Sequence, residues 1–173
     1  MKTAPTYQLG LVFAVHPTAK GFGWVLFESP LSPIDWGLAS ARTGRNARLL
    51  ARFERLLKRY EPAVLILEAY EGRAAGRSDR IKDLCQSMQH LAACQGIETR
   101  VYERSAIRLC FASTGAHTRY EIALTIAQRI DALSHRLPRK RSSWMNGDPR
   151  QSLFDAAALA VTYFAATGRG QPQ

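Results

Sequence analysis

Short runs of consecutive apolar residues mark the strands of this chain. Leu9–Val15 and Ala63–Leu67 are apolar throughout, which is typical of strands buried on both faces of a sheet. The His16-Pro17 pair ends the first of these runs. The predicted strands are Leu9–Val15, Phe22–Glu28, Ile34–Ser40, Ala63–Leu67 and Glu98–Tyr102. Because the first three follow one another closely, we expect them to form an antiparallel meander.

Apolar residues at spacings of three and four predict the helices. The clearest helix carries Leu49, Phe53 and Leu57 on one face and a stripe of arginines from Arg45 to Arg59 on another. Glu61-Pro62 ends this helix. Further helices are predicted from Ser78 or Asp79 to Gly96, over Ser105–Phe111, around Ile122–Ile130 and over Gln151–Ala166.

Buried strands that alternate with helices indicate an α/β protein. We expect a mixed five-stranded sheet, with three antiparallel strands followed by parallel strands, flanked by helices. The sequence has no visible internal repeat and no linker long enough to separate two domains. We therefore predict a single domain over residues 1–173, with a core from about 8 to 167 and a flexible C-terminal tail.

The charge balance narrows the range of partners. The chain has 24 Lys and Arg residues against 14 Asp and Glu residues, a formal net charge of +10. A basic domain attracts polyanions, of which nucleic acid is the commonest soluble one and an acidic membrane surface is the rival. No apolar run approaches the roughly 20 residues of a membrane span. The first residues do not resemble a secretory signal, so we expect a cytoplasmic protein without a membrane partner.

Polar residues stand where the buried strands end, which is where ligands bind in open α/β sheets. His16 follows the first strand and Glu68 the fourth, while Asp155 lies near the start of the last helix. Ser152 shares the face of Asp155, and Asp148 lies just upstream. Clustered carboxylates suit Mg²⁺ or Mn²⁺, and a basic surface around them would favour phosphodiester chemistry. From spacing alone the simpler interpretation is structural, because a helix dipole favours an Asp near its start.

Four segments, in their order along the chain, resemble the RuvC family of Holliday-junction resolvases. LVFAVHPTAKGFGWVLFE is similar to the opening strand, turn and second strand of that family, and AVLILEAY to the strand that ends in a catalytic Glu. FDAAALAVTYF is similar to the closing helix, and STGAHTRYEIALTI, more weakly, to the turn and helix that place a basic residue near the scissile phosphate. The resemblance spans roughly residues 9 to 166 and implies a ribonuclease H-like fold.

The resemblance assigns roles to individual residues. It makes Glu68 and Asp155 catalytic carboxylates that bind Mg²⁺ or Mn²⁺, and it puts Arg119 in the place of a catalytic Lys that contacts the phosphate. Tyr70 would lie in the loop that probes the junction. A homodimer is also implied, because a four-way junction presents two symmetric cuts.

Two positions depart from the family pattern. His16 stands where the family has its first Asp, and Ser152 stands where a second helix Asp or a His is usual. An imidazole is a softer ligand without negative charge, so the metal could be lost. Three outcomes stay open: an inactive site, one metal held by His16, Glu68 and Asp155, or Asp148 as the replacement carboxylate. His16 could also act as a general base.

Several basic residues are candidates for contacts with nucleic acid. The loop after Glu68 carries Arg73, Arg77 and Arg80, and a second basic loop carries Arg139, Lys140 and Arg141 beside Trp144, an aromatic residue that could stack on a base. The remaining candidates are Tyr70, Arg104 and Arg119. Contacts of guanidinium groups to phosphate give affinity without sequence information.

The first functional interpretation is a metal-dependent endonuclease that cuts branched or structured DNA of the Holliday-junction type, with a place in DNA recombination and repair. One alternative is a degenerate RuvC-like protein that binds such DNA without cutting it. Another is a ribonuclease H-like enzyme that acts on RNA or on an RNA–DNA hybrid.

Overall fold

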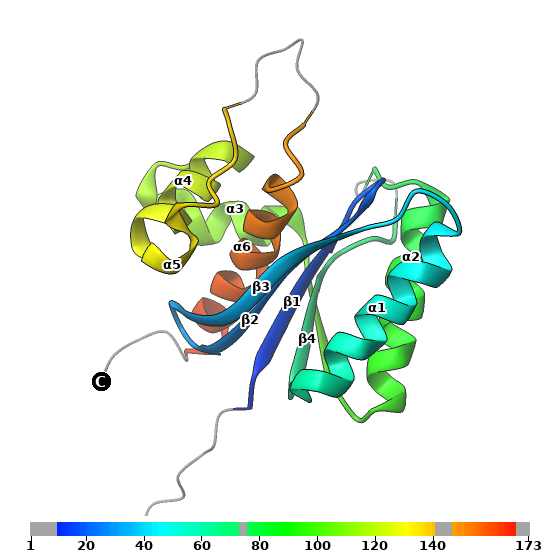
Figure 1. Ribbon diagram of the computed structural model, residues 1–173. Coiled ribbons are helices and arrows are strands. Elements are labelled where there is room, and N and C mark those ends of the chain that lie inside the picture. The colour runs from blue at the N-terminus through cyan, green and yellow to red at the C-terminus, as the bar shows by residue number, and fades with distance from the viewer. Residues whose placement is uncertain (1–9, 73–75, 141–146, 169–173) are drawn as a thin grey trace, which may run out of the picture.

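A five-stranded mixed sheet forms the centre of the molecule (Figure 1). The computed structural model describes residues 10–72, 76–140 and 147–168. The strand order is β3-β2-β1-β4-β5. β1 pairs antiparallel with β2 and β2 with β3, whereas β1 with β4 and β4 with β5 are parallel. The strands are β1 Val12–Pro17, β2 Gly21–Ser29, β3 Ser32–Ser40, β4 Val64–Glu68 and β5 Glu98–Tyr102. The predicted meander and the mixed sheet are confirmed.

The first strand is longer at its end than the sequence predicts. His16 and Pro17 do not end the strand but belong to it, opposite Gly23 and Phe22 of β2. The pairing of β1 with β4 ends at Ala14, so the rest of β1 is paired with β2 alone. A proline is tolerated in such a position because its missing N–H interrupts no ladder.

The helices cover both faces of the sheet (Figure 1). Two helices lie on one face, α1 Arg45–Tyr60 and α2 Asp79–Cys94. On the other face lie α3 Arg104–Phe111, the 3-10 turn η2 Ala112–Thr114, α4 Arg119–Arg129, α5 Asp131–Ser134 and α6 Gln151–Ala166. The one-turn helix α5 is too short to give a periodic signal, and the sequence does not predict it. None of the described helices is both long enough and apolar enough to cross a bilayer.

Alternation along the strands divides the core into two layers. In β1, Phe13 and Val15 pack against α1 and α2, whereas Val12 and Ala14 pack against the side of α6. In β4, Leu65 and Leu67 belong to the first layer. Val64 and Ile66 belong to the second. Because successive side chains of a strand point to opposite faces, the residues that continue the second set, His16 and Glu68, also face α6.

The last five residues of the expected C-terminal tail, 169–173, lie outside the described residues.

Candidate functional site

His16, Glu68 and Asp155 meet at one end of the sheet. The His16 Nε2 atom lies 2.9 Å from Oε2 of Glu68, and its Nδ1 atom lies 3.7 Å from Oδ2 of Asp155. All three residues are buried, with exposed fractions of 4%, 8% and 3%. The strand parity explains the first two, and α6, which covers the face to which they point, supplies the third. The structure therefore brings together the three residues that the sequence singled out.

Gly23 makes this meeting possible. It is the register partner of His16 in β2, and the start of α6 lies directly against it. A Cβ atom at this position would be 2.3 Å from the carbonyl carbon of Ser152 and 2.4 Å from the nitrogen of Leu153. Any side chain would thus push α6, and Asp155 with it, away from the sheet. Sequence reasoning does not identify this residue as part of the site, although the Gly-Phe-Gly run is visible.

Arg77 links the ends of β1 and β4. Its Nη2 atom lies 2.9 Å from His16 Nε2 and donates to Glu68 Oε2 at 3.1 Å, while Nη1 donates to the carbonyl of Pro17 at 2.8 Å. The Nε2 atom of His16 can serve one partner at a time, since with its proton it donates to Glu68 and without it it accepts from Arg77. The Arg77 side chain is only 12% exposed. Arg77, which the sequence suggests as a nucleic-acid contact, lies inside the cluster, and that contact stays a prediction.

Two further arginines reach the same carboxylates. Arg104, the first residue of α3, donates to Glu68 Oε2 at 2.9 Å, and its Nη1 lies 3.9 Å from Asp155 Oδ1. Arg119, the first residue of α4, donates from Nε to Oδ1 of Asp155 at 3.2 Å and from Nη2 to Oδ2. Gln151 adds a bond from Nε2 to Asp155 Oδ1 at 3.2 Å. Gln151 is a member of the site that sequence reasoning missed.

The local sequence fixes where Arg119 points. Thr118 and Glu121 form a capping box at the start of α4, in which the Thr118 side chain accepts from the Glu121 N–H and the Glu121 side chain accepts from the Thr118 N–H. This cap holds the first turn of α4, and with it Arg119, opposite α6. Burial lowers the pKa of Arg119, but the hydrogen bond and charge of Asp155 outweigh it and raise that pKa above its ordinary value.

The charges within the cluster stabilise the ionised carboxylates. Burial raises the pKa of Glu68, but the hydrogen bond and charge of His16 and the charges of Arg104 and Arg77 outweigh it and lower that pKa to about 2. Glu68 and Asp155 carry two negative charges, whereas Arg77, Arg104 and Arg119 carry three positive ones. Leaving His16 out of this count, the cluster has an excess of one positive charge.

This donor set does not fit a divalent cation. One oxygen of Glu68 faces three nitrogen donors, and both oxygens of Asp155 face Arg119 or Gln151. A hard cation requires carboxylate oxygens with surplus negative charge, and the guanidinium groups already neutralise them. Within the described ranges, no group of three or more His, Cys, Asp or Glu residues is arranged to hold a metal. The expected metal ligands thus converge as an ion-pair cluster.

Ser152 and Asp148 stay outside the cluster. The Ser152 hydroxyl donates to the Pro149 carbonyl at 2.7 Å. Asp148 accepts from Nη2 of Arg150 at 2.7 Å and from the backbone N–H of Arg139 at 3.1 Å. The hydrogen bond from Arg150 outweighs burial and lowers the pKa of Asp148 to about 2. Among the described residues no contact joins Asp148 to His16, Glu68 or Asp155, so Asp148 does not supply the missing carboxylate here.

The other candidate residues fall into four groups. Tyr70 is buried, 7% exposed, and its hydroxyl donates to Gln89, so its ring is not presented at the surface. Arg80 bonds to Asn46 and to the Ala19 carbonyl. Arg139 and Lys140 are exposed. Arg73 and Arg141 lie outside the described residues, as does Trp144.

Solved structures of Holliday-junction resolvases are similar to this protein in fold. RuvC of Thermus thermophilus, in complex with its Holliday-junction substrate, superposes with a TM-score of 0.66 at 18% identity, covering 95% of this chain and 99% of that one. The yeast mitochondrial Holliday-junction resolvase superposes with a TM-score of 0.65 at 14% identity, covering 96% of this chain and 82% of that one. No protein-family model and no curated protein sequence matches. At these identities the similarity concerns the fold, and the chain has the mixed-sheet, ribonuclease H-like fold of the RuvC resolvases.

Proposed function

We propose that this protein binds branched DNA through a basic site at the ends of β1 and β4, and that it does so without metal-dependent hydrolysis. The observation that carries the proposal is the convergence of three guanidinium groups on the two buried carboxylates. The likeness of the fold to junction resolvases supports the choice of DNA as the ligand.

Arg104 and Arg119 are the cluster members that can meet a phosphate. Their side chains are 25% and 52% exposed, whereas that of Arg77 is 12% exposed. A guanidinium group has five N–H donors, and Arg119 directs only two groups, Nε and Nη2, at Asp155. Its remaining donors are available to a backbone oxygen. Such contacts displace counterions from DNA, so binding should weaken steeply as salt rises.

Metal-dependent cleavage is the second candidate, and one observation favours it. His16, Glu68 and Asp155 stand together at the strand ends, which is the arrangement expected of a nuclease site in this fold. To hold a cation there, Glu68 would have to exchange the guanidinium groups of Arg77 and Arg104 for the metal. A direct test of cleavage therefore distinguishes the two candidate functions.

The test combines binding and cleavage on the same substrates. A labelled four-way junction, a linear duplex and an RNA–DNA hybrid are titrated in EDTA and then incubated with Mg²⁺ or Mn²⁺. We expect salt-dependent binding of the junction in EDTA and no cleavage in either metal. Cleavage that disappears in Glu68→Gln and Asp155→Asn would establish the endonuclease and overturn the proposal. Preference for the hybrid would reassign the substrate, and weak, salt-independent binding would overturn nucleic-acid binding altogether.

A matched pair of variants tests the site itself. Arg119→Ala removes the most exposed member of the cluster, and Arg129→Ala removes one equally charged, exposed residue at the other end of α4. We expect only the first to weaken junction binding. Because the junction is two-fold symmetric, we also expect two copies of the chain per junction, measurable by light scattering of the complex.

A further inference from the structure

Helix α1 carries half of the excess positive charge of the chain. Six basic side chains stand on it against one acidic side chain, Glu54, which is an excess of five out of the net ten. Glu54 forms its ion pair with Lys58, 2.7 Å away, and not with an arginine. The five arginines are Arg45, Arg48, Arg52, Arg55 and Arg59, called here the α1 stripe, and all five are exposed.

The α1 stripe is narrow and long. Its members alternate between spacings of three and four residues, so at 100° per residue they fall within an arc of about 80°. With a rise of 1.5 Å per residue the stripe extends over about 21 Å. Like charges at these spacings repel one another by a few tenths of a kcal/mol per pair. Within the described part of the chain, Arg48, Arg52 and Arg55 have no acidic residue within ion-pair distance to offset this repulsion.

The stripe begins beside the proposed site. Arg45, at the start of α1, and Arg80, near the start of α2, both donate to the carbonyl of Ala19 in the turn between β1 and β2. Asn46 bonds with Arg80 as well. Arg77, which contacts His16 and Glu68, is three residues before Arg80. Basic side chains therefore lead from the cluster to the start of α1 and continue along its exposed side.

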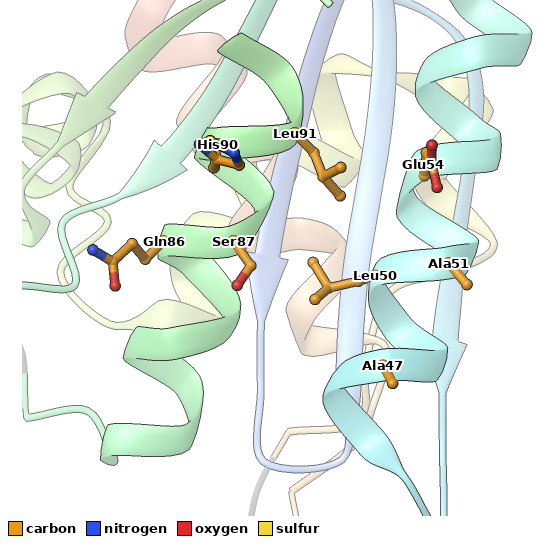
Figure 2. Close-up of a pocket in the computed structure, with 8 residues that line it drawn as sticks. All are labelled: Ala47, Leu50, Ala51, Glu54, Gln86, Ser87, His90 and Leu91. Carbon is orange, nitrogen blue, oxygen red and sulfur yellow. The ribbon is translucent and has the colours of Figure 1, made fainter. Parts of the chain in front are cut away.

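The apolar residues of α1 face away from this track. Leu49, Phe53 and Leu57 are buried against the sheet. A groove of about 640 Å³ runs between α1 and α2, and Leu50 and Leu91 point into it from the two helices (Figure 2). A helix that lies in a membrane surface needs exposed apolar side chains beside its basic ones. On α1 the exposed apolar side chains are the small ones of Ala47 and Ala51, while Leu50 and Leu56 are half-buried. A nucleic-acid backbone is therefore the polyanion that the α1 stripe fits better than a membrane.

We infer that the α1 stripe binds the sugar–phosphate backbone of a DNA arm that extends from the site. The inference rests on the proposed function for the identity of the polyanion. Successive arginines are about 5 Å apart along the axis, and the whole stripe matches the length of about six base pairs at 3.4 Å each. Contacts of this kind carry no sequence information and raise affinity for any arm alike.

The test compares three double variants. Arg52→Ala/Arg55→Ala removes two charges from the stripe, and Arg52→Lys/Arg55→Lys keeps them. Arg129→Ala/Arg136→Ala removes two charges from exposed positions at the end of α4 and after α5, across the sheet from α1. Alanine is the best helix former, so the first variant should fold. Binding to a 24-base-pair duplex and to a four-way junction is measured as a function of salt.

We expect the slope of log K against log salt to fall by about 2 in the stripe-to-alanine variant, since each phosphate contact contributes about 0.9. The lysine variant and the α4–α5 control should keep the slope of the unaltered protein. If Arg119→Ala weakens binding but the stripe variant does not change the slope, the stripe inference fails and the proposed function stands. If the unaltered protein binds no DNA, the proposed function fails first. Binding of the stripe to anionic vesicles, with an unchanged DNA slope, would also overturn the inference.

Discussion

Replacement of Glu68 by Gln distinguishes an ion-pair cluster from a metal site by the sign of its effect on stability. In this structure the Glu68 carboxylate is 8% exposed and faces His16, Arg77 and Arg104. Gln keeps the shape and one oxygen but removes the charge, so Arg77 and Arg104 each lose their ion pair with Glu68. We therefore expect Glu68→Gln to destabilise the protein.

The size of this loss follows from the pKa of the group. Glu68 has its pKa lowered from 4.5 to about 2, and at 1.36 kcal/mol per pKa unit this corresponds to about 3 kcal/mol of stability at neutral pH. Loss of one partner from a buried ion pair typically costs about 3–5 kcal/mol, which agrees. For a chain of this size such a loss lowers the melting temperature by roughly 6–12 °C.

The pH dependence has a definite direction. A carboxyl whose pKa is lowered on folding contributes its stability above the unfolded pKa, and that contribution is lost as the pH falls through the folded pKa. The difference between the unaltered protein and Glu68→Gln should therefore be full above about pH 5 and shrink as the pH approaches 2.

Urea denaturation in EDTA measures this difference directly. Glu71→Gln is the matched control, because it makes the same chemical change at an exposed position three residues away, and we expect it to change stability by less than about 0.5 kcal/mol. In a metal site without its metal, clustered carboxylates repel one another, so the same change would be neutral or stabilising. An increase in stability of Glu68→Gln in EDTA would refute the ion-pair interpretation.

Three further predictions follow from the site. His16→Asp alone should not create Mn²⁺ binding in a paramagnetic resonance titration, because three carboxylates would still face three guanidinium groups. The double variant His16→Asp/Arg77→Gln should bind the ion, and binding by the single variant would contradict this prediction. Gly23→Ala should destabilise the protein by about 2–3 kcal/mol in urea, since its Cβ would meet the backbone at the start of α6. Arg119→Ala should lower the salt slope of junction binding by about 1, and an equal effect of Arg129→Ala would show that only total charge matters.

Most of the fold could be predicted because its signals are local. The wholly apolar runs in β1 and β4 indicate buried strands, and the spacing of Leu49, Phe53 and Leu57 indicates α1. The end of β1 could not be placed, because His16 and Pro17 are poor strand formers that are held there by pairing with β2. That pairing arises only when the sheet has formed, and nothing in the residues around His16 and Pro17 indicates it.

The candidate site could be predicted only in part, for a related reason. His16 and Glu68 continue an alternating pattern at strand ends, so their common face follows from parity. The direction of an arginine side chain in a loop has no such rule. The sequence suggests a solvent-facing contact for Arg77, and only the folded structure shows its bonds to Pro17 and Glu68. The sequence therefore indicated the acids and also Arg77, Arg104 and Arg119, but it assigned these arginines to nucleic acid and gave no sign of their ion pairs with Glu68 and Asp155.

The distribution of charge connects these findings. An imidazole in place of a carboxylate at position 16 leaves the site with two carboxylates, and arginines from three separate segments of the chain pair with them. Once Arg77, Arg104 and Arg119 are present, a return of the carboxylate at position 16 alone yields a neutral cluster, not an acidic one. Under the proposed function, four positions together disfavour a cation, and the guanidinium groups could hold a phosphate without one. An excess of arginine is also present along α1, where it is exposed, so under the proposed function the cluster and the α1 stripe both favour a polyanion.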